Sequence, residues 1–142
     1  MRFFVDANIA IYTRLPSEYR EPCLRILAAV AAGEADGTTS TAAMEEVWHF
    51  ELSGRAGPLP GLTADTHQTF MPVLAVTDEI FARALSLSDL RIGANDRIHA
   101  ATCLINDIET IVSADRDFDA VEQLIRVDPL DSEAVEELLD LR

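Results

Sequence analysis

The chain has 142 residues, 49% of them hydrophobic and 25% charged, which is the profile of an ordinary globular protein and the length of one domain. Its formal net charge of −14 argues against broad, non-specific nucleic-acid binding, because that activity usually requires a basic face. No apolar run approaches the roughly 20 residues that span a bilayer. Asp6 interrupts the N-terminus before a signal peptide could form, so we expect a cytoplasmic protein without a membrane partner.

Short apolar, β-branched or aromatic runs alternate along the chain with longer segments of helical periodicity. In chain order, we predict a strand at 2–5, helices at 9–15 and 18–32, a strand at 37–40, helices at 41–53 and 64–70, a strand at 73–76, helices at 78–87 and 95–105, strands at 110–113 and 124–127, and a helix at 133–141. Gly33 is placed to end the second helix, and Ser40 or Thr41, Thr77 and Ser132 to cap later ones. This alternation predicts an α/β fold with a parallel sheet covered on both faces. Ligands of such sheets bind beyond the carboxyl ends of the strands.

Four acidic residues stand where these predicted elements meet. Asp6 and Asp115 each follow an apolar run, and Glu46 and Asp96 lie near the starts of predicted helices. Taken singly, each has an ordinary explanation as a helix cap, a turn residue or a solvated side chain. Together they would meet at one end of the sheet, where their mutual repulsion requires a cation. Hard oxygen ligands, with no thiolate and no obligatory imidazole, favour Mg²⁺ or Mn²⁺.

Neighbouring residues extend this acidic cluster. Asp117 and Asp119 could bind a metal directly or through water, while Phe118 between them is expected to pack under the sheet and fix the turn. Glu45 directly precedes Glu46 in the chain. Because adjacent helical residues point about 100° apart, only one of these two glutamates can face the cluster.

Other residues have structural interpretations. Cys23 and Cys103 show no metal-ligand spacing and are predicted to be reduced core thiols. We interpret His99 as a core or hydrogen-bonding histidine and Trp48 as a packing residue, against the core or a partner. Arg97 directly follows Asp96, so it could contact a phosphate or steady the neighbouring carboxylate.

Four segments of the chain resemble, in order and spacing, the four motifs of the PIN-domain family. They are VDANIAIY, TSTAAMEEVW, NDRIHAATC and TIVSADRDF. The likeness covers nearly the whole chain and is closest to the VapC-type toxins of bacterial toxin–antitoxin pairs. It implies a single PIN domain over residues 1–142. The implied fold has three layers, with helices on both faces of a parallel sheet of four to five strands.

The resemblance also implies site residues and a function. Motif by motif, the family's catalytic, metal-binding acids fall on Asp6, Glu46, Asp96 and Asp115, and a further metal-binding acid falls on Asp117. Glu46 is preferred to Glu45 because the family's acid usually precedes an aliphatic residue, here Val47. The implied activity is that of a Mg²⁺- or Mn²⁺-dependent endoribonuclease, a toxin held inactive by a cognate VapB-type antitoxin. The family commonly forms homodimers through its helices, and the apolar segment 18–32 is a candidate surface.

Two other families, haloacid-dehalogenase-like phosphatases and response-regulator receivers, also place an aspartate after their first strand. Both rely on a lysine near the phosphoryl group, whereas all 11 basic residues of this chain are arginines. The same absence excludes a Walker A motif. The alternative that stays open is a PIN-like domain that binds metal, RNA or a protein partner without cleaving, because sequence alone does not show turnover.

Overall fold

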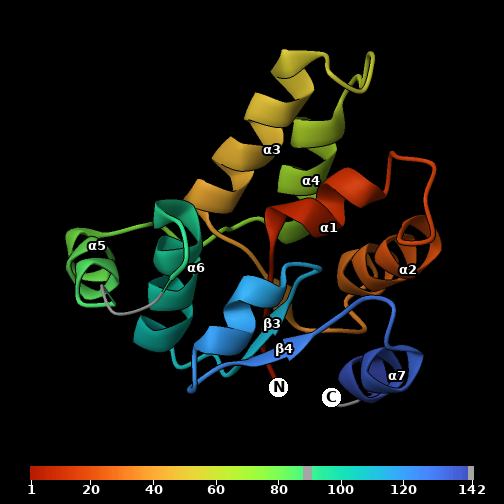
Figure 1. Cartoon of the computed structure of the whole chain (residues 1–142). Coiled ribbons are helices and arrows are strands. Elements are labelled where there is room, and N and C mark those ends of the chain that lie inside the picture. The colour runs from red at the N-terminus through yellow and green to blue at the C-terminus, as the bar shows by residue number, and fades with distance from the viewer. Residues whose placement is uncertain (88–90, 141–142) are drawn as a thin grey trace.

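Four short parallel strands form a sheet at the centre of the computed structural model, which describes residues 1–87 and 91–140 (Figure 1). The strands are β1 (Phe3–Val5), β2 (Gly37–Thr38), β3 (Thr110–Val112) and β4 (Ile125–Val127), in the spatial order β2–β1–β3–β4. β1 pairs with β3 from Phe3↔Thr110 to Val5↔Val112, and every residue of both strands is buried. The predicted α/β class with a parallel sheet is therefore confirmed, and β1 and β3 are its central strands.

The predicted strand at 73–76 is wrong. This segment makes one isolated bridge, in which the Leu74 N–H donates to the Thr39 carbonyl and the Thr41 N–H donates to the Leu74 carbonyl, both at 2.9 Å. The pairing ends there because the opposite segment leaves the sheet. Ser40 caps the helix that begins at Thr41, its hydroxyl accepting from the Ala43 N–H at 3.2 Å, and so offers no further strand partner.

Helices make up most of the rest of the described chain. Within residues 1–87 and 91–140 they are α1 (Ala7–Tyr12), α2 (Arg20–Ala31), α3 (Thr41–Ser53), α4 (Leu62–Phe70), α5 (Asp78–Leu85), α6 (Ala94–Ile105), the 3₁₀ helix η1 (Arg116–Ala120) and α7 (Ser132–Asp140). All seven predicted α-helices are present, whereas η1 is not predicted. The cap of α7 is Asp131 and not Ser132, because the Asp131 carboxylate accepts from the Ala134 N–H at 3.1 Å. None of the described helices is long and apolar enough to cross a membrane.

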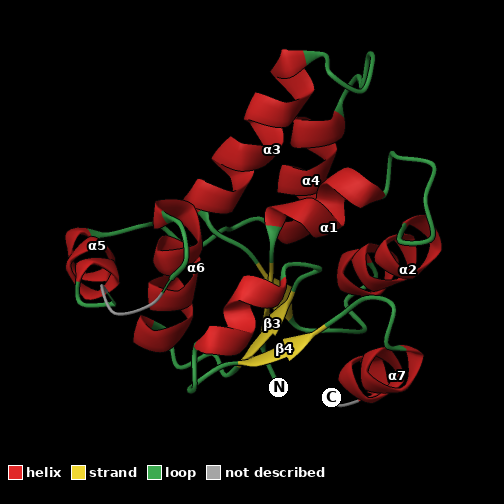
Figure 2. Cartoon of the chain, in the orientation of Figure 1, coloured by secondary structure: helices red, strands yellow, loops and turns green. Residues whose placement is uncertain are grey.

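The core lies in two layers, one on each face of the sheet. Phe4 and Ile111 face a cluster formed with α3 and α6, while Phe3 and Val112 face a cluster formed with α2 and α7. This division follows from the two-residue period of a strand, which sends alternate side chains to opposite faces. Figure 2 shows the strands enclosed accordingly, with α5 and α6 on one side and α2 and α7 on the other.

Both cysteines are buried, one in each core layer. Cys23 packs among the residues around α2, and Cys103 among those around α6. Both are free thiols, and burial raises the pKa of each to about 12. The prediction that they are reduced core thiols agrees with this environment.

Candidate metal centre

The carboxyl ends of β1 and β3 bring the predicted acids together. Asp6 directly follows β1, and its N–H donates to the Val112 carbonyl of β3 at 3.0 Å, so the two strand exits lie side by side. The five acids and His99 form two groups, in each of which one ligand atom per residue lies within 4.8 Å of the others. The first group is Asp6, Glu46 and His99, and the second is Asp96, Asp115 and Asp117.

Asp6 is the most deeply placed acid, with only 4% of its surface exposed. Its Oδ1 accepts from the Ala7 N–H at 2.8 Å, and its Oδ2 accepts from the Ser113 hydroxyl at 2.6 Å and from the Asn8 amide at 3.2 Å. Burial raises the pKa of Asp6, and the charge of Glu46 adds to this; the charge of His99 and the hydrogen bonds from Ser113 and Ala7 only partly offset the rise. The carboxylate is thus held in one orientation, in a place where ionisation is costly unless a cation is near.

The turn after β3 carries two members of the second group, Asp115 and Asp117. The Asp115 N–H donates to the Ser113 hydroxyl at 3.0 Å, and the Asp115 carboxylate accepts from the Asp117 N–H at 2.9 Å, which begins η1. Phe118 is fully buried and anchors this turn in the core, as expected. Asp119, a candidate ligand in the sequence, belongs to neither group. Its carboxylate pairs with Arg126 at 2.9 Å, and this hydrogen bond lowers its pKa.

Asp96, in the first turn of α6, has a strongly perturbed acidity. Its pKa rises from 3.8 to about 7, first because of burial, then because of its hydrogen bond with Asp115 and the charges of Asp6 and Asp115. His99 acts in the opposite direction. Near neutral pH, the carboxylates therefore cannot all ionise at no cost. A divalent cation, for which carboxylate oxygens are suitable ligands, would relieve this repulsion, so the residues fit Mg²⁺ or Mn²⁺.

Glu46, and not Glu45, faces the cluster. Glu46 Oε1 lies 2.6 Å from Nε2 of His99, and the same nitrogen lies 3.8 Å from Oδ1 of Asp6. The Glu45 side chain is 72% exposed and pairs with His49 at 3.5 Å. Burial would lower the pKa of His99, but the hydrogen bond to Glu46 and the charges of the surrounding acids outweigh it, so the pKa is raised.

Three further polar residues support the site and are not identified from the sequence. Asn8 and Ser113 join Asp6 to the turn after β3, since the Asn8 amide also donates to the Ser113 hydroxyl at 3.3 Å. Arg126 donates to the Ser113 carbonyl at 3.0 Å and pairs with Asp119 and Asp128. The only sequence signal is proximity, because Asn8 is two positions after Asp6 and Ser113 two before Asp115.

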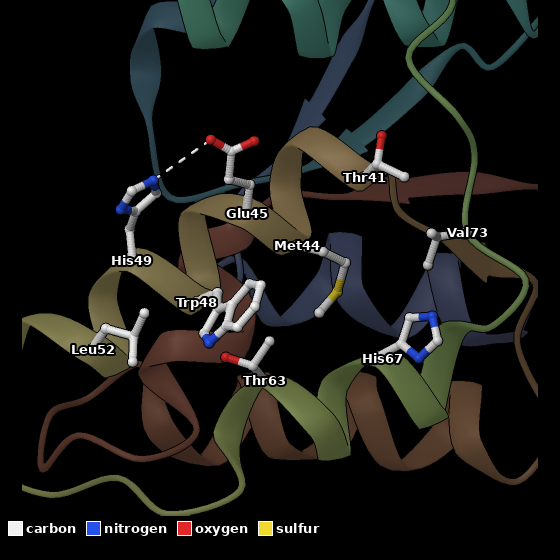
Figure 3. A pocket seen from close by; sticks show the side chains of 9 residues that line it. All are labelled: Thr41, Met44, Glu45, Trp48, His49, Leu52, Thr63, His67 and Val73. Atoms are coloured by element: carbon white, nitrogen blue, oxygen red, sulfur yellow. Dashed lines mark ion pairs between the residues drawn. The ribbon is translucent and has the colours of Figure 1, made fainter.

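Two hollows adjoin along α3. The smaller, of about 330 Å³, includes Glu46 at the edge of the cluster together with Asn95 and Ile98. The larger, of about 620 Å³, runs between α3 and α4, and Figure 3 shows Met44 and Trp48 lining it opposite Thr63 and His67. Trp48 is 56% exposed, so it lies on this surface and not in the core. None of the five clustered acids lines the larger hollow, so it is separate from the candidate metal centre.

The fold and the site define an α/β protein with a carboxylate cluster at the carboxyl ends of its central parallel strands. Within this class, the family model described as the PIN domain matches residues 3–124, and the chain belongs to the PIN-domain family. The matched segment contains all five acids of the cluster. A search of curated protein sequences finds no match.

Several solved structures share the fold. VapBC2 from Rickettsia felis, bound to a DNA fragment from its promoter, is 16% identical over 90% of this chain and 98% of that chain, with a TM-score of 0.67. VapC20 from Mycobacterium tuberculosis, described as a sarcin–ricin loop cleaving toxin, is 17% identical over 88% and 98%, with a TM-score of 0.69. A toxin–antitoxin complex from Klebsiella pneumoniae is 20% identical over 89% and 96%, with a TM-score of 0.65. At these identities the likeness shows a common fold.

Proposed function

We propose that this chain is a Mg²⁺- or Mn²⁺-dependent endoribonuclease. The observation that carries the proposal is the pair of adjoining ligand groups at the ends of β1 and β3, in which Asp96 has a pKa of about 7. Membership of the PIN-domain family, typically one of nucleases, supports the same activity. The proposed metal-holding residues, ligating directly or through water, are Asp6, Glu46, Asp96, Asp115 and Asp117.

The side chains have separate tasks in this mechanism. When bound, a divalent cation supplies an activated water for in-line attack on a phosphodiester and stabilises the leaving oxygen. Asp6 is oriented by Ser113 and Asn8, so its carboxylate needs no rearrangement to act as a ligand. Asp96 would hold the cation as a carboxylate, so its proton would have to leave to solvent, since metal ligands must be deprotonated. No nucleophilic side chain of the protein is needed.

RNA cleavage by the purified chain, in Mg²⁺, in Mn²⁺ and in EDTA, tests this proposal. We expect Asp6→Ala and Asp96→Ala to lower cleavage at least about 100-fold, because a bound metal supplies several kcal/mol of transition-state stabilisation. Glu46→Ala should also be impaired, whereas Glu45→Ala, on the same helix but facing solvent, is the matched control. If the protein binds metal but cuts no RNA under either ion, the non-cleaving PIN-like alternative replaces the proposal.

We further propose that the chain is a VapC-type toxin held inactive by a VapB-type antitoxin. Support comes from the shared fold with VapBC2 of Rickettsia felis and with the Klebsiella pneumoniae toxin–antitoxin complex. Growth arrest on expression, relieved by a co-expressed antitoxin gene from the same locus, is the expected result. Unaffected growth with an active site intact would contradict it. Because its proposed substrate is cellular RNA, we place its action in the cytoplasm.

The proposed assembly is a homodimer of one-domain chains. Residues 125–142 lie beyond the family match, but Val135 and Leu138 of α7 join the core layer of α2, and Arg25 pairs with Glu136 at 2.6 Å. This contact supports one domain over residues 1–142. The apolar side of α2 is already occupied, with Cys23 and Ile26 buried, so segment 18–32 offers less free apolar surface than expected. Light scattering of the purified chain would measure the oligomeric state.

A further inference from the structure

We propose that His99 is a positioning residue, whose Nε2–H holds Glu46 in the metal centre, and that His99 is not itself a metal ligand. The proposal rests on the proposed function, because it concerns the same cluster. It goes beyond that function by giving a role to the one imidazole among the acids and by limiting the metal ligands to oxygens.

The first argument is the set of atoms around Nε2. The ring is fully buried, one helical turn after Asp96 on α6, and Nε2 lies 2.6 Å from Glu46 Oε1 and 3.8 Å from Asp6 Oδ1. An ionised carboxylate can only accept hydrogen bonds. A lone pair on Nε2 would therefore face two electron-rich oxygens, whereas a hydrogen on Nε2 makes a short, charge-assisted bond to one of them.

The second argument is the surroundings of Nδ1. This atom is buried, and no donor or acceptor within residues 1–87 and 91–140 bonds to it. The ring instead lies against Phe4, with centroids 5.6 Å apart. A histidine that ligates metal through Nε2 carries its proton on Nδ1 and almost always donates it to a second acceptor. No such acceptor lies beside Nδ1 in the described residues, so the second contact that orients a metal-ligating histidine is missing here.

The consequence for Glu46 is that its carboxylate is fixed from one side only. The Glu46 side chain is 30% exposed, and its hydrogen bond within the described residues is the one to His99. Removing that donor would free the carboxylate to turn toward solvent. Because His99 uses Nε2 for this bond, the ligands left for a cation are carboxylate oxygens, which suit Mg²⁺ and Mn²⁺.

Nitrogen spectroscopy tests the donor directly and needs no RNA. In ¹⁵N-labelled protein, we expect the Nε2 signal of His99 to show an attached proton both without metal and with Mg²⁺. The other two histidines, His49 and His67, are exposed and serve as references, and His99→Gln assigns the third signal. Pulsed electron paramagnetic resonance of the Mn²⁺ complex should show no ¹⁴N imidazole modulation. An unprotonated Nε2, or imidazole modulation that disappears in His99→Gln, overturns the proposal.

A pair of amide variants separates positioning from packing. The amide nitrogen of Gln reaches about as far as Nε2 of His, whereas that of Asn reaches only as far as Nδ1. We expect His99→Gln to keep Mn²⁺ affinity and cleavage within about threefold, and His99→Asn to lose about 10- to 100-fold. Thermal unfolding of both variants shows whether each is folded. Equal losses in the two variants, or no loss in a folded His99→Asn, contradict positioning. The nitrogen and affinity measurements remain decisive if the chain cuts no RNA.

Discussion

Replacing Asp96 by Asn should stabilise the metal-free protein at alkaline pH while abolishing tight metal binding. The pKa of Asp96 is raised from 3.8 to about 7, first by burial and then by neighbouring carboxylates. Between these two pH values the native state binds more protons than the unfolded state, so stability falls as pH rises. The stabilising effect of the protonated form is fully present below pH 3.8 and is lost as pH rises through about 7.

The size of this effect follows from the pKa rise. A rise from 3.8 to about 7, at about 1.4 kcal/mol per unit, corresponds to ~4 kcal/mol as an upper limit. Asp96 is only half-buried, so solvent screening reduces it, and we expect ~1–2 kcal/mol at pH 8. Asn keeps the shape of the side chain and cannot ionise. The Asp96→Asn protein should therefore gain this amount at pH 8 and almost nothing at pH 4.

Urea unfolding in EDTA, followed by circular dichroism at pH 4, 6 and 8, measures the difference between the two proteins. Asp36→Asn is a suitable control, because the Asp36 side chain is 63% exposed and its ion pair with Arg2 is long, at 3.7 Å. It should change stability by less than about 0.5 kcal/mol at each pH. A gain from Asp96→Asn that is the same at pH 4 and pH 8, or no gain at pH 8, would refute the electrostatic reasoning.

Three other predictions follow from the same contacts. Mn²⁺ affinity, measured by calorimetry, should weaken about tenfold from pH 8 to pH 6, because a proton on Asp96 with a pKa of about 7 competes with the metal; a constant affinity would contradict this. Ser113→Ala should cost ~1–3 kcal/mol in urea unfolding, because buried Asp6 loses its 2.6 Å donor, while exposed Ser53→Ala should cost little. Cys23 and Cys103, each with a pKa of about 12, should react with a thiol reagent at pH 8 only after unfolding. Rapid labelling of the native protein would contradict the burial of these thiols.

The sheet was predictable where a strand is specified by its own residues. Phe3–Val5 and Thr110–Val112 are short apolar runs that are buried on both faces, and both are strands. Residues 73–76 form a similar run, yet they make only one bridge, because α3 begins at Thr41 and removes the partner backbone. A local pattern contains no information about where a distant partner ends. The start of the helix at Thr41 was predicted, but only the three-dimensional structure shows that residues 73–76 lie beside the segment that this helix ends.

The site residues also differ in whether the local sequence reveals them or only contacts between distant segments do. The acids are found in the sequence because each stands at a recognisable junction, and the choice of Glu46 over Glu45 rests on helix geometry plus a family preference. Asn8 and Ser113 are not found, because their role depends on contacts across 105 and 107 positions, from Asn8 to Ser113 and from Asp6 to Ser113. Nothing in either residue's own neighbourhood marks it as a support for Asp6.

The net charge of −14 limits how the proposed RNA substrate could be recognised. Like charges on protein and RNA repel, but at physiological ionic strength exposed charges are screened beyond about 8 Å. We therefore expect no long-range steering toward RNA, and under the proposed function RNA binding would depend on short-range contacts at the metal centre. A cation among Asp6, Asp96 and their neighbours would lower the local negative charge where a phosphate has to approach. Under the proposed function, we therefore expect a bound cation to favour RNA binding as well as cleavage.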